Sequence, residues 1–183
     1  MNQQQKILYA SQQLGLNLAG MQGTTRNVYD TLPLPGTGDV TLEFFKNVGQ
    51  RAFPDTNVSD NKFQAGSGLL VEAIALYGVG AEGIPQAGTL QPITGNTRAE
   101  LIIANQTVLK DIPLTEVVGQ SNMSKGALSR VFYLAPLVGI LIPPQLEFTL
   151  RVHIQDAQND ALIGRIGAYL YGTGILTNLK TSL

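Results

Sequence analysis

Residues 139–155 read GILIPPQLEFTLRVHIQ, and the second half of this stretch alternates strictly between apolar and polar side chains. The apolar residues of one parity are Leu146, Phe148, Leu150, Val152 and Ile154. The polar residues between them are Glu147, Thr149, Arg151, His153 and Gln155. A period of two is typical of a β-strand that buries one face and turns the other to water. The stretch therefore predicts a strand in a sheet that packs one face on a core.

Further strand patterns occur on both sides of this stretch, and turn-forming residues separate them. The segments are residues 39–48, 68–79, 98–109, 130–142 and 163–176. Pro136 and Gly139 fall inside the fourth segment and predict a bent or interrupted strand there. Helix patterns are weak, although residues 114–128 can form one or two turns. Strands without intervening helices predict an all-β, antiparallel two-sheet sandwich of jelly-roll type.

The beginning of the chain differs from the remainder. It is rich in glutamine, continues with mixed apolar and amide residues, and ends in the Pro- and Gly-rich segment TLPLPGTGD. We predict an N-terminal arm over residues 1–38 and one β-sandwich domain over residues 39–183. An arm with this apolar content is expected to dock, either on its own domain or on a neighbouring molecule.

Composition excludes several classes of function. The net charge is −1 and no basic run occurs, so nucleic acid is not expected to be the main partner. There is no cysteine, which excludes disulfides, thiolate metal sites and a cysteine nucleophile. Charged residues make up only 14% of the chain. This low charge fits either a surface that meets other protein or a loop-rich surface of uncharged polar residues.

No membrane span or secretion signal is expected. The apolar stretches are far shorter than the roughly 20 residues that cross a bilayer, and the N-terminus lacks the apolar region of a signal peptide. We therefore expect the protein to be made in a cytosol.

Candidate sites for chemistry are few. GVGAEG at 78–83 matches the dinucleotide-binding pattern, but the prolines that follow forbid the helix this motif needs, so a glycine-rich loop is predicted. His153 is the single histidine and cannot by itself form the metal centre of a cupin-like jelly roll. We expect a structural role for His153, no cofactor and no catalytic residue.

Two features keep other functions open. Glu72 interrupts the apolar run LLVEAIAL, and a carboxylate there needs a partner, for which Arg98 or Arg151 is the simplest candidate. An enzyme on a β scaffold would need a second carboxylate near Glu72. A lectin-like or receptor-binding sandwich would instead use exposed aromatic residues, and the candidates are Tyr133, Tyr169 and Tyr171.

Two long stretches carry a resemblance to a known family. They are LPLPGTGDVTLEFFKNVGQRAFPDTNVSDNKFQAGSGLLVEAIALYGV and LVGILIPPQLEFTLRVHIQ. Over about residues 30–175 the order of elements resembles the single jelly-roll virion proteins of bacteriophages, either coat or decoration proteins. The resemblance implies a non-enzymatic structural protein of the virion that associates with copies of itself, as a trimer or a larger shell, and with other virion proteins.

The charge of the N-terminal arm differs from that of many coat proteins. Arms that line a genome are often basic, whereas this one has only Lys6 before Arg26. This favours an arm that binds protein neighbours. The residues expected at the oligomer interface are Ile7, Leu8, Tyr9, Leu14, Leu16, Leu18, Leu32 and Leu34.

Overall fold

The computed structural model describes residues 2–17, 20–34, 38–79, 97–113, 132–134, 139–157 and 165–177. In this part of the chain, helix α1 (Gln3–Leu14) precedes a series of strands, with the 3₁₀ helix η2 (Val48–Gln50) between the second and third strands. The strands are β1 (Met21–Pro33), β2 (Gly38–Phe44), β3 (Ser67–Val79), β4 (Thr97–Ile103), β5 (Gln106–Pro113), β6 (Phe132–Leu134), β7 (Ile140–Ile142), β8 (Phe148–Ala157) and β9 (Arg165–Thr177).

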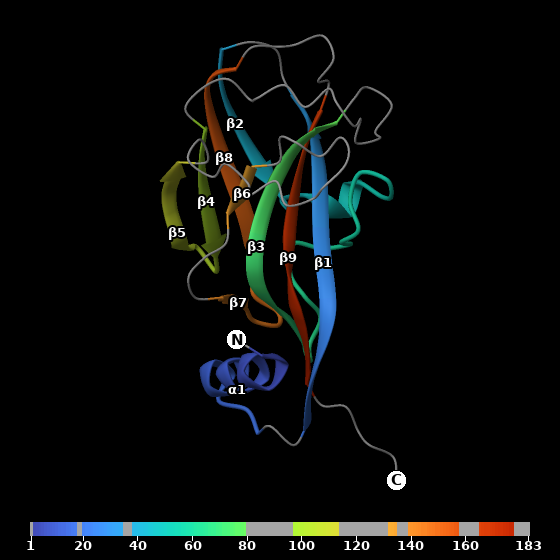
Figure 1. Ribbon diagram of the computed structural model, residues 1–183. Coiled ribbons are helices and arrows are strands. Elements are labelled where there is room, and N and C mark those ends of the chain that lie inside the picture. The colour runs from blue at the N-terminus through green and yellow to red at the C-terminus, as the bar shows by residue number, and fades with distance from the viewer. Residues whose placement is uncertain are drawn as a thin grey trace, which may run out of the picture.

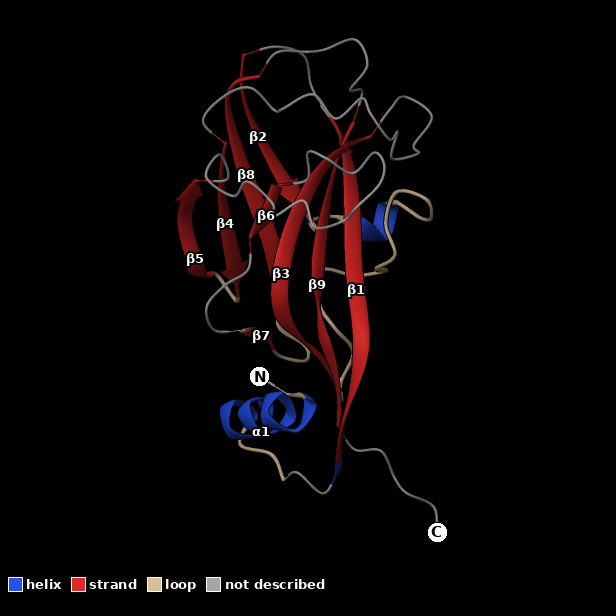
Figure 2. Cartoon of the chain, in the orientation of Figure 1, coloured by secondary structure: helices blue, strands red, loops and turns tan. Residues whose placement is uncertain are grey.

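The strands form two antiparallel sheets that face each other, with α1 at one end of the molecule (Figures 1 and 2). The first sheet has the order β1-β9-β3-β6, and β7 also pairs with β3. The second sheet has the order β2-β8-β4-β5. The predicted all-β two-sheet sandwich is confirmed.

The pairing order identifies the sandwich as a jelly roll. β1 pairs with β9, β2 with β8, β3 with β6 and β7, and β4 with β5. The chain is thus one long hairpin of strand pairs, and successive pairs alternate between the two sheets. Rolling such a hairpin into a sandwich produces the two Greek keys of this architecture.

The core lies between the two sheets. Alternate residues of each strand face this space, and these residues are mostly apolar. In β8, the four apolar residues from Phe148 to Ile154 are at most 1% exposed, as the sequence predicts. Leu146 shares their parity but precedes β8 and is 39% exposed. Burying large aliphatic and aromatic side chains contributes about 1.5–3 kcal/mol each, so this inner layer supplies most of the driving force for folding.

Two strand predictions have different outcomes. The interrupted strand over residues 130–142 is confirmed, because β6 and β7 pair with successive parts of β3. Residues 98–109, predicted as one strand, instead contain a hairpin. Ala104 and Asn105 have φ values of 48° and 64° and form its two-residue turn.

The predicted arm also differs from the observed structure. Residues 21–33 form β1, which pairs with β9 from Met21 to Pro33 and belongs to the sandwich. The sequence of β1 does not show the alternation typical of a sandwich strand, because its inner face carries polar residues such as Arg26 and Asp30. Of the predicted arm, helix α1 lies outside the two sheets.

Candidate functional surfaces

Helix α1 forms because its ends are capped, although its apolar periodicity is weak. The Gln5 backbone N–H donates to Asn2 Oδ1 at 2.9 Å, and the Asn2 N–H donates to Gln5 Oε1 at 2.9 Å. This reciprocal pair is a capping box, which satisfies two otherwise unpaired donors. Gly15 ends the helix with φ 63°, a left-handed conformation that glycine adopts without a steric cost.

Helix α1 docks on the outer face of the first sheet. Gly23 of β1 leaves room for Ile7, since a Cβ added to Gly23 would lie 3.1 Å from Ile7 Cδ1. Gln3 Nε2 donates to the Gly23 carbonyl at 3.2 Å. Lys6 Nζ lies 2.5 Å from Glu72 Oε1. Apolar packing, a hydrogen bond and an ion pair therefore hold α1 on its own sandwich.

Glu72 has a different partner from the predicted arginine. The pairing between β3 and β9 shifts register between Val71 and Ala73, so Glu72 lies at a bulge. Its carboxylate pairs with Lys6 and accepts a hydrogen bond from Thr173 Oγ1 at 3.2 Å. The prediction of Arg98 or Arg151 is wrong because both arginines belong to the other sheet.

The residues predicted for an oligomer interface fall into three groups. On α1, Ile7, Tyr9 and Leu14 are half-buried. Leu8 on the helix and Leu16 just after it remain 43% and 40% exposed. The other residues have separate positions: Leu32 and Leu34 pack against the core of their own sandwich, and Leu18 lies outside the described residues.

A row of tyrosines crosses the outer face of β1 and β9. Tyr29 and Tyr169 are partners in the pairing of these strands, and their ring centroids lie 5.3 Å apart. Tyr171 follows on the same face, with its ring centroid 5.4 Å from that of Tyr169 and the planes only 14° apart. We call Tyr29, Tyr169 and Tyr171 the tyrosine row. Two of the predicted aromatic candidates thus come together, while Tyr133 lies in β6 and its side chain is outside the described part.

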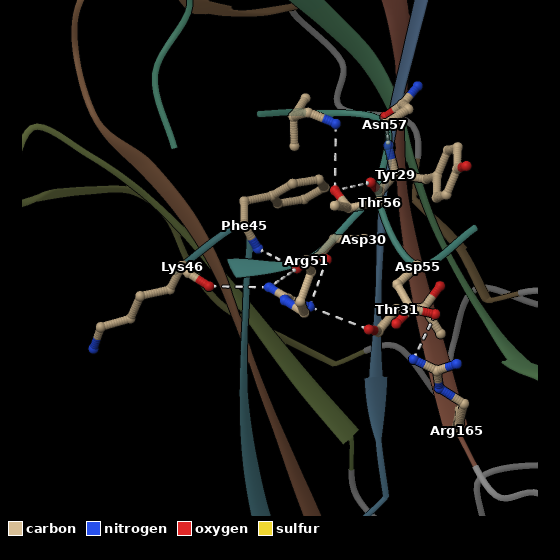
Figure 3. A network of polar contacts seen from close by, with 11 residues as sticks. Tyr29, Asp30, Thr31, Phe45, Lys46, Arg51, Asp55, Thr56, Asn57 and Arg165 are labelled. Carbon is tan, nitrogen blue, oxygen red and sulfur yellow. Dashed lines mark hydrogen bonds and ion pairs between the residues drawn. The ribbon is translucent and has the colours of Figure 1, made fainter. Parts of the chain in front are cut away.

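Residues 45–58, which we call the edge segment, cover the free edge of β1 over residues 27–31 (Figure 3). The Thr31 N–H donates to the Asp55 carbonyl at 2.8 Å, and the Tyr29 N–H donates to Asn57 Oδ1 at 2.8 Å. Asn57 also donates from Nδ2 to the Asn27 carbonyl at 2.9 Å. These bonds occupy backbone groups that an edge strand otherwise offers to another chain.

A buried ion pair anchors the edge segment. Asp30 is 0% exposed, and its Oδ1 lies 2.6 Å from Arg51 Nη1. Its Oδ2 accepts from Arg51 Nη2 at 2.9 Å and from the Phe45 N–H at 2.7 Å. Arg51 also donates to the carbonyls of Thr31 and Lys46 at 3.1 and 3.0 Å. Burial nevertheless raises the pKa of the Asp30 carboxyl, because desolvation outweighs the opposing effects of Phe45 and Arg51.

Two further contacts hold the edge segment, one at Phe45 and one at Asp55. Phe45 has φ 65°, which is costly for a residue with a bulky side chain, and the hydrogen bond to Asp30 stabilises it there. Farther along, Arg165 of β9 lies 2.7 Å from Asp55 and lowers the pKa of that carboxyl, chiefly through a hydrogen bond. Between these anchors, Phe53 is 83% exposed.

A pocket of about 320 Å³ opens beside Arg51. It is lined by Leu32, Glu43, Lys46, Asn47, Gln50 and Arg51. Lys46 forms an ion pair with Glu43, whose pKa is lowered by this contact and by Arg151. The sequence alone indicates neither the pocket nor the exposure of Phe53, since both depend on contacts between the edge segment and β1.

The outer face of the second sheet carries a ladder of charges. Arg151 of β8 lies 2.9 Å from Glu43 on β2 and 3.5 Å from Glu100 on β4. His153 Nδ1 is 3.0 Å from Thr41 Oγ1, and its side chain is 42% exposed. Within the described ranges, no three His, Asp or Glu side chains lie together as metal ligands would. The ladder therefore provides cross-strand ion pairs, as expected for opposite charges on neighbouring strands.

Comparison with known proteins finds neither a matching family model nor a matching curated protein. No helix in the described residues has the length and apolar character needed to cross a bilayer.

Proposed function

We propose that this chain is a structural protein of a virus particle, whose copies associate to build or decorate the capsid shell. The observation that carries the proposal is the jelly-roll pairing order together with a docked N-terminal helix that leaves leucines exposed. Jelly rolls serve in viral capsids, in lectins and in metal-binding cupins. A cupin centre needs several histidines, and this chain has one. The protein would be made in the host cytoplasm and used in the virion.

The exposed leucines support association through α1. Leu8 lies on a helix that its own sandwich already holds in place through Ile7 and Lys6, and Leu16 follows this helix; both leucine side chains are exposed. A surface that is ordered before contact loses less conformational entropy on binding. Copies that pack these leucines against one another, or against another virion protein, would bury apolar area without refolding.

Light scattering at two concentrations, with electron microscopy of the same sample, tests the proposal. A stable trimer or shell-like particles are expected for the wild type, and particles formed without other proteins would identify a coat rather than a decoration protein. Leu8→Ser combined with Leu16→Ser should reduce association but leave the sandwich folded. Val108→Ser is the matched control, since Val108 is 46% exposed on β5. A wild-type monomer at high concentration would contradict the proposal.

The tyrosine row favours a second candidate, a ligand-binding sandwich of lectin type. Tyr171 is 36% exposed, and Thr173 and Glu72 lie on the same face beyond it. Sugars stack on aromatic rings and hydrogen-bond to carboxylates, so these groups suit a hexose. The chain has no tryptophan, so its fluorescence reports on tyrosine alone. A change on adding glucose, galactose or mannose that Tyr171→Ser abolishes would support this candidate, and no response to any of them would contradict it.

A further inference from the structure

Phe53 is the most exposed large apolar side chain in the described part of the chain, at 83%. Single apolar residues on a surface are ordinary and need no explanation. Phe53 differs because the backbone on both sides of it is held by ion pairs and because a pocket lined partly by the same segment lies close to it in the sequence.

The backbone around Phe53 is held at three points. Before it, Arg51 is paired with the buried Asp30. After it, Asp55 is paired with Arg165 of β9. Between these points, the Asp55 N–H donates to the Ala52 carbonyl at 2.9 Å and closes the turn that carries the ring. A side chain on a backbone that is already fixed loses less entropy on binding, and aromatic residues often dominate the binding energy of an interface.

The pocket beside Arg51 combines one apolar residue with charged and polar groups. Leu32 supplies the apolar surface, and Lys46 and Arg51 supply cations, the kind of group that attracts the face of an aromatic ring. Lys46 is paired with Glu43, which also lines the pocket, and Arg51 is paired with Asp30. A contact between a cation and a ring already occurs inside this protein, where the Arg26 guanidinium lies 4.3 Å from the centroid of the Phe63 ring. Asn47 and Gln50 complete the lining with polar groups, which suits the rim of an interface.

The residues that line the pocket do not include Phe53 of the same chain. We infer that Phe53 docks in this pocket on a second copy of the protein, so that the edge segments of two copies form an interface. This inference rests on the proposed self-association and adds a second contact, at the edge segment, to the one proposed through α1. Because ring and pocket share one segment, a two-fold pair would make the contact twice, while a closed ring of copies would make it once per neighbour.

The test is sedimentation velocity of the full-length protein over a range of concentrations. Phe53→Ser should weaken self-association by about 30-fold or more, the factor that corresponds to a loss of about 2 kcal/mol. Phe53→Tyr keeps the ring and should associate as the wild type does. Val108→Ser, an equally simple loss of exposed apolar surface, should have no effect. Circular dichroism and thermal melting would verify that each variant is folded.

A second variant tests the pocket independently. Gln50→Trp should fill the pocket from one side and weaken association as Phe53→Ser does. A mixture of the two variants should associate more strongly than either alone, because one supplies an intact ring and the other an intact pocket. A wild type that stays monomeric would overturn both the proposed function and this inference. A wild type that associates, with Phe53→Ser associating equally well, would overturn this inference alone.

Discussion

Replacing Arg51 with methionine would leave the Asp30 carboxylate buried without its counter-ion. Methionine keeps most of the length of the arginine side chain, so packing around the stem is largely preserved. The change removes the ion pair at 2.6 Å and the donors to the carbonyls of Thr31 and Lys46. The Phe45 N–H still donates to the carboxylate, but it carries no full charge.

The expected cost follows from burial. Asp30 is 0% exposed and the Arg51 side chain is 19% exposed, so solvent screens the pair weakly. Removing one partner of such a pair costs about 3–5 kcal/mol. For a chain of this size, each kcal/mol lowers the melting temperature by about 2–4 °C, so a drop of about 6–20 °C is expected at pH 7.

The loss should depend on pH in a defined direction. The pKa of Asp30 already lies above its ordinary value of 3.8 because of desolvation, and Arg51 is one of the groups that lower it. Without Arg51 the pKa rises further. A group with a raised pKa in the folded state stabilises the protein below its unfolded pKa and loses this effect as the pH rises through the folded pKa. The loss of stability relative to the wild type should therefore be larger at pH 7 than at pH 5.

Urea unfolding followed by circular dichroism at pH 5 and pH 7 measures both quantities. Arg151→Met is the control, because its ion pairs with Glu43 and Glu100 lie on the outer face of the second sheet, where the three side chains are 35%, 28% and 19% exposed, and each pair should contribute less than about 1 kcal/mol. A loss below about 1 kcal/mol for Arg51→Met at pH 7, within the range of ordinary surface changes, would refute the reasoning. So would a loss of equal size at both pH values.

Further substitutions test the packing. Gly172→Ala should destabilise by about 1–3 kcal/mol or more in urea unfolding, since its Cβ would lie 1.9 Å from the Leu70 carbonyl oxygen. Wild-type stability in this variant would contradict the close approach of β3 and β9. Leu150→Ala should cost about 2–5 kcal/mol, whereas Leu146→Ala should change stability by less than about 0.5 kcal/mol in the same assay. Glu72→Gln should cost less than about 1 kcal/mol in thermal melts, because the carboxylate that pairs with the lysine of α1 is 34% exposed.

The sequence predicts the parts of the fold in which one side-chain pattern repeats. β8 alternates without exception from Phe148 to Gln155, so its period and its buried face follow directly. The break between β6 and β7 follows from Pro136 and Gly139. The two-sheet sandwich then follows, because amphipathic strands need a second layer to cover their apolar faces.

The sequence does not predict features that depend on distant contacts. The turn at Ala104–Asn105 contains neither glycine nor proline, and only Asn105 belongs to the types that tolerate a left-handed conformation. The position of α1 depends on Gly23, and the partner of Glu72 comes from that helix. Asp30 resembles an ordinary polar residue of a strand until the edge segment brings Arg51 onto it. For the same reason the candidate interface at Phe53 could not be recognised from the sequence.

The edge segment links stability to the kind of association that we propose. β1 is the outermost strand of its sheet, and the unpaired backbone groups of an uncovered strand edge can pair with another chain. By covering β1 while presenting Phe53, the segment would replace unspecific backbone pairing with a side-chain contact. Arg51→Met should therefore loosen the segment and give irregular aggregates, whereas Phe53→Ser should give smaller, soluble species. Electron microscopy and light scattering would separate these results, and regular particles from both variants would show that the segment controls neither process.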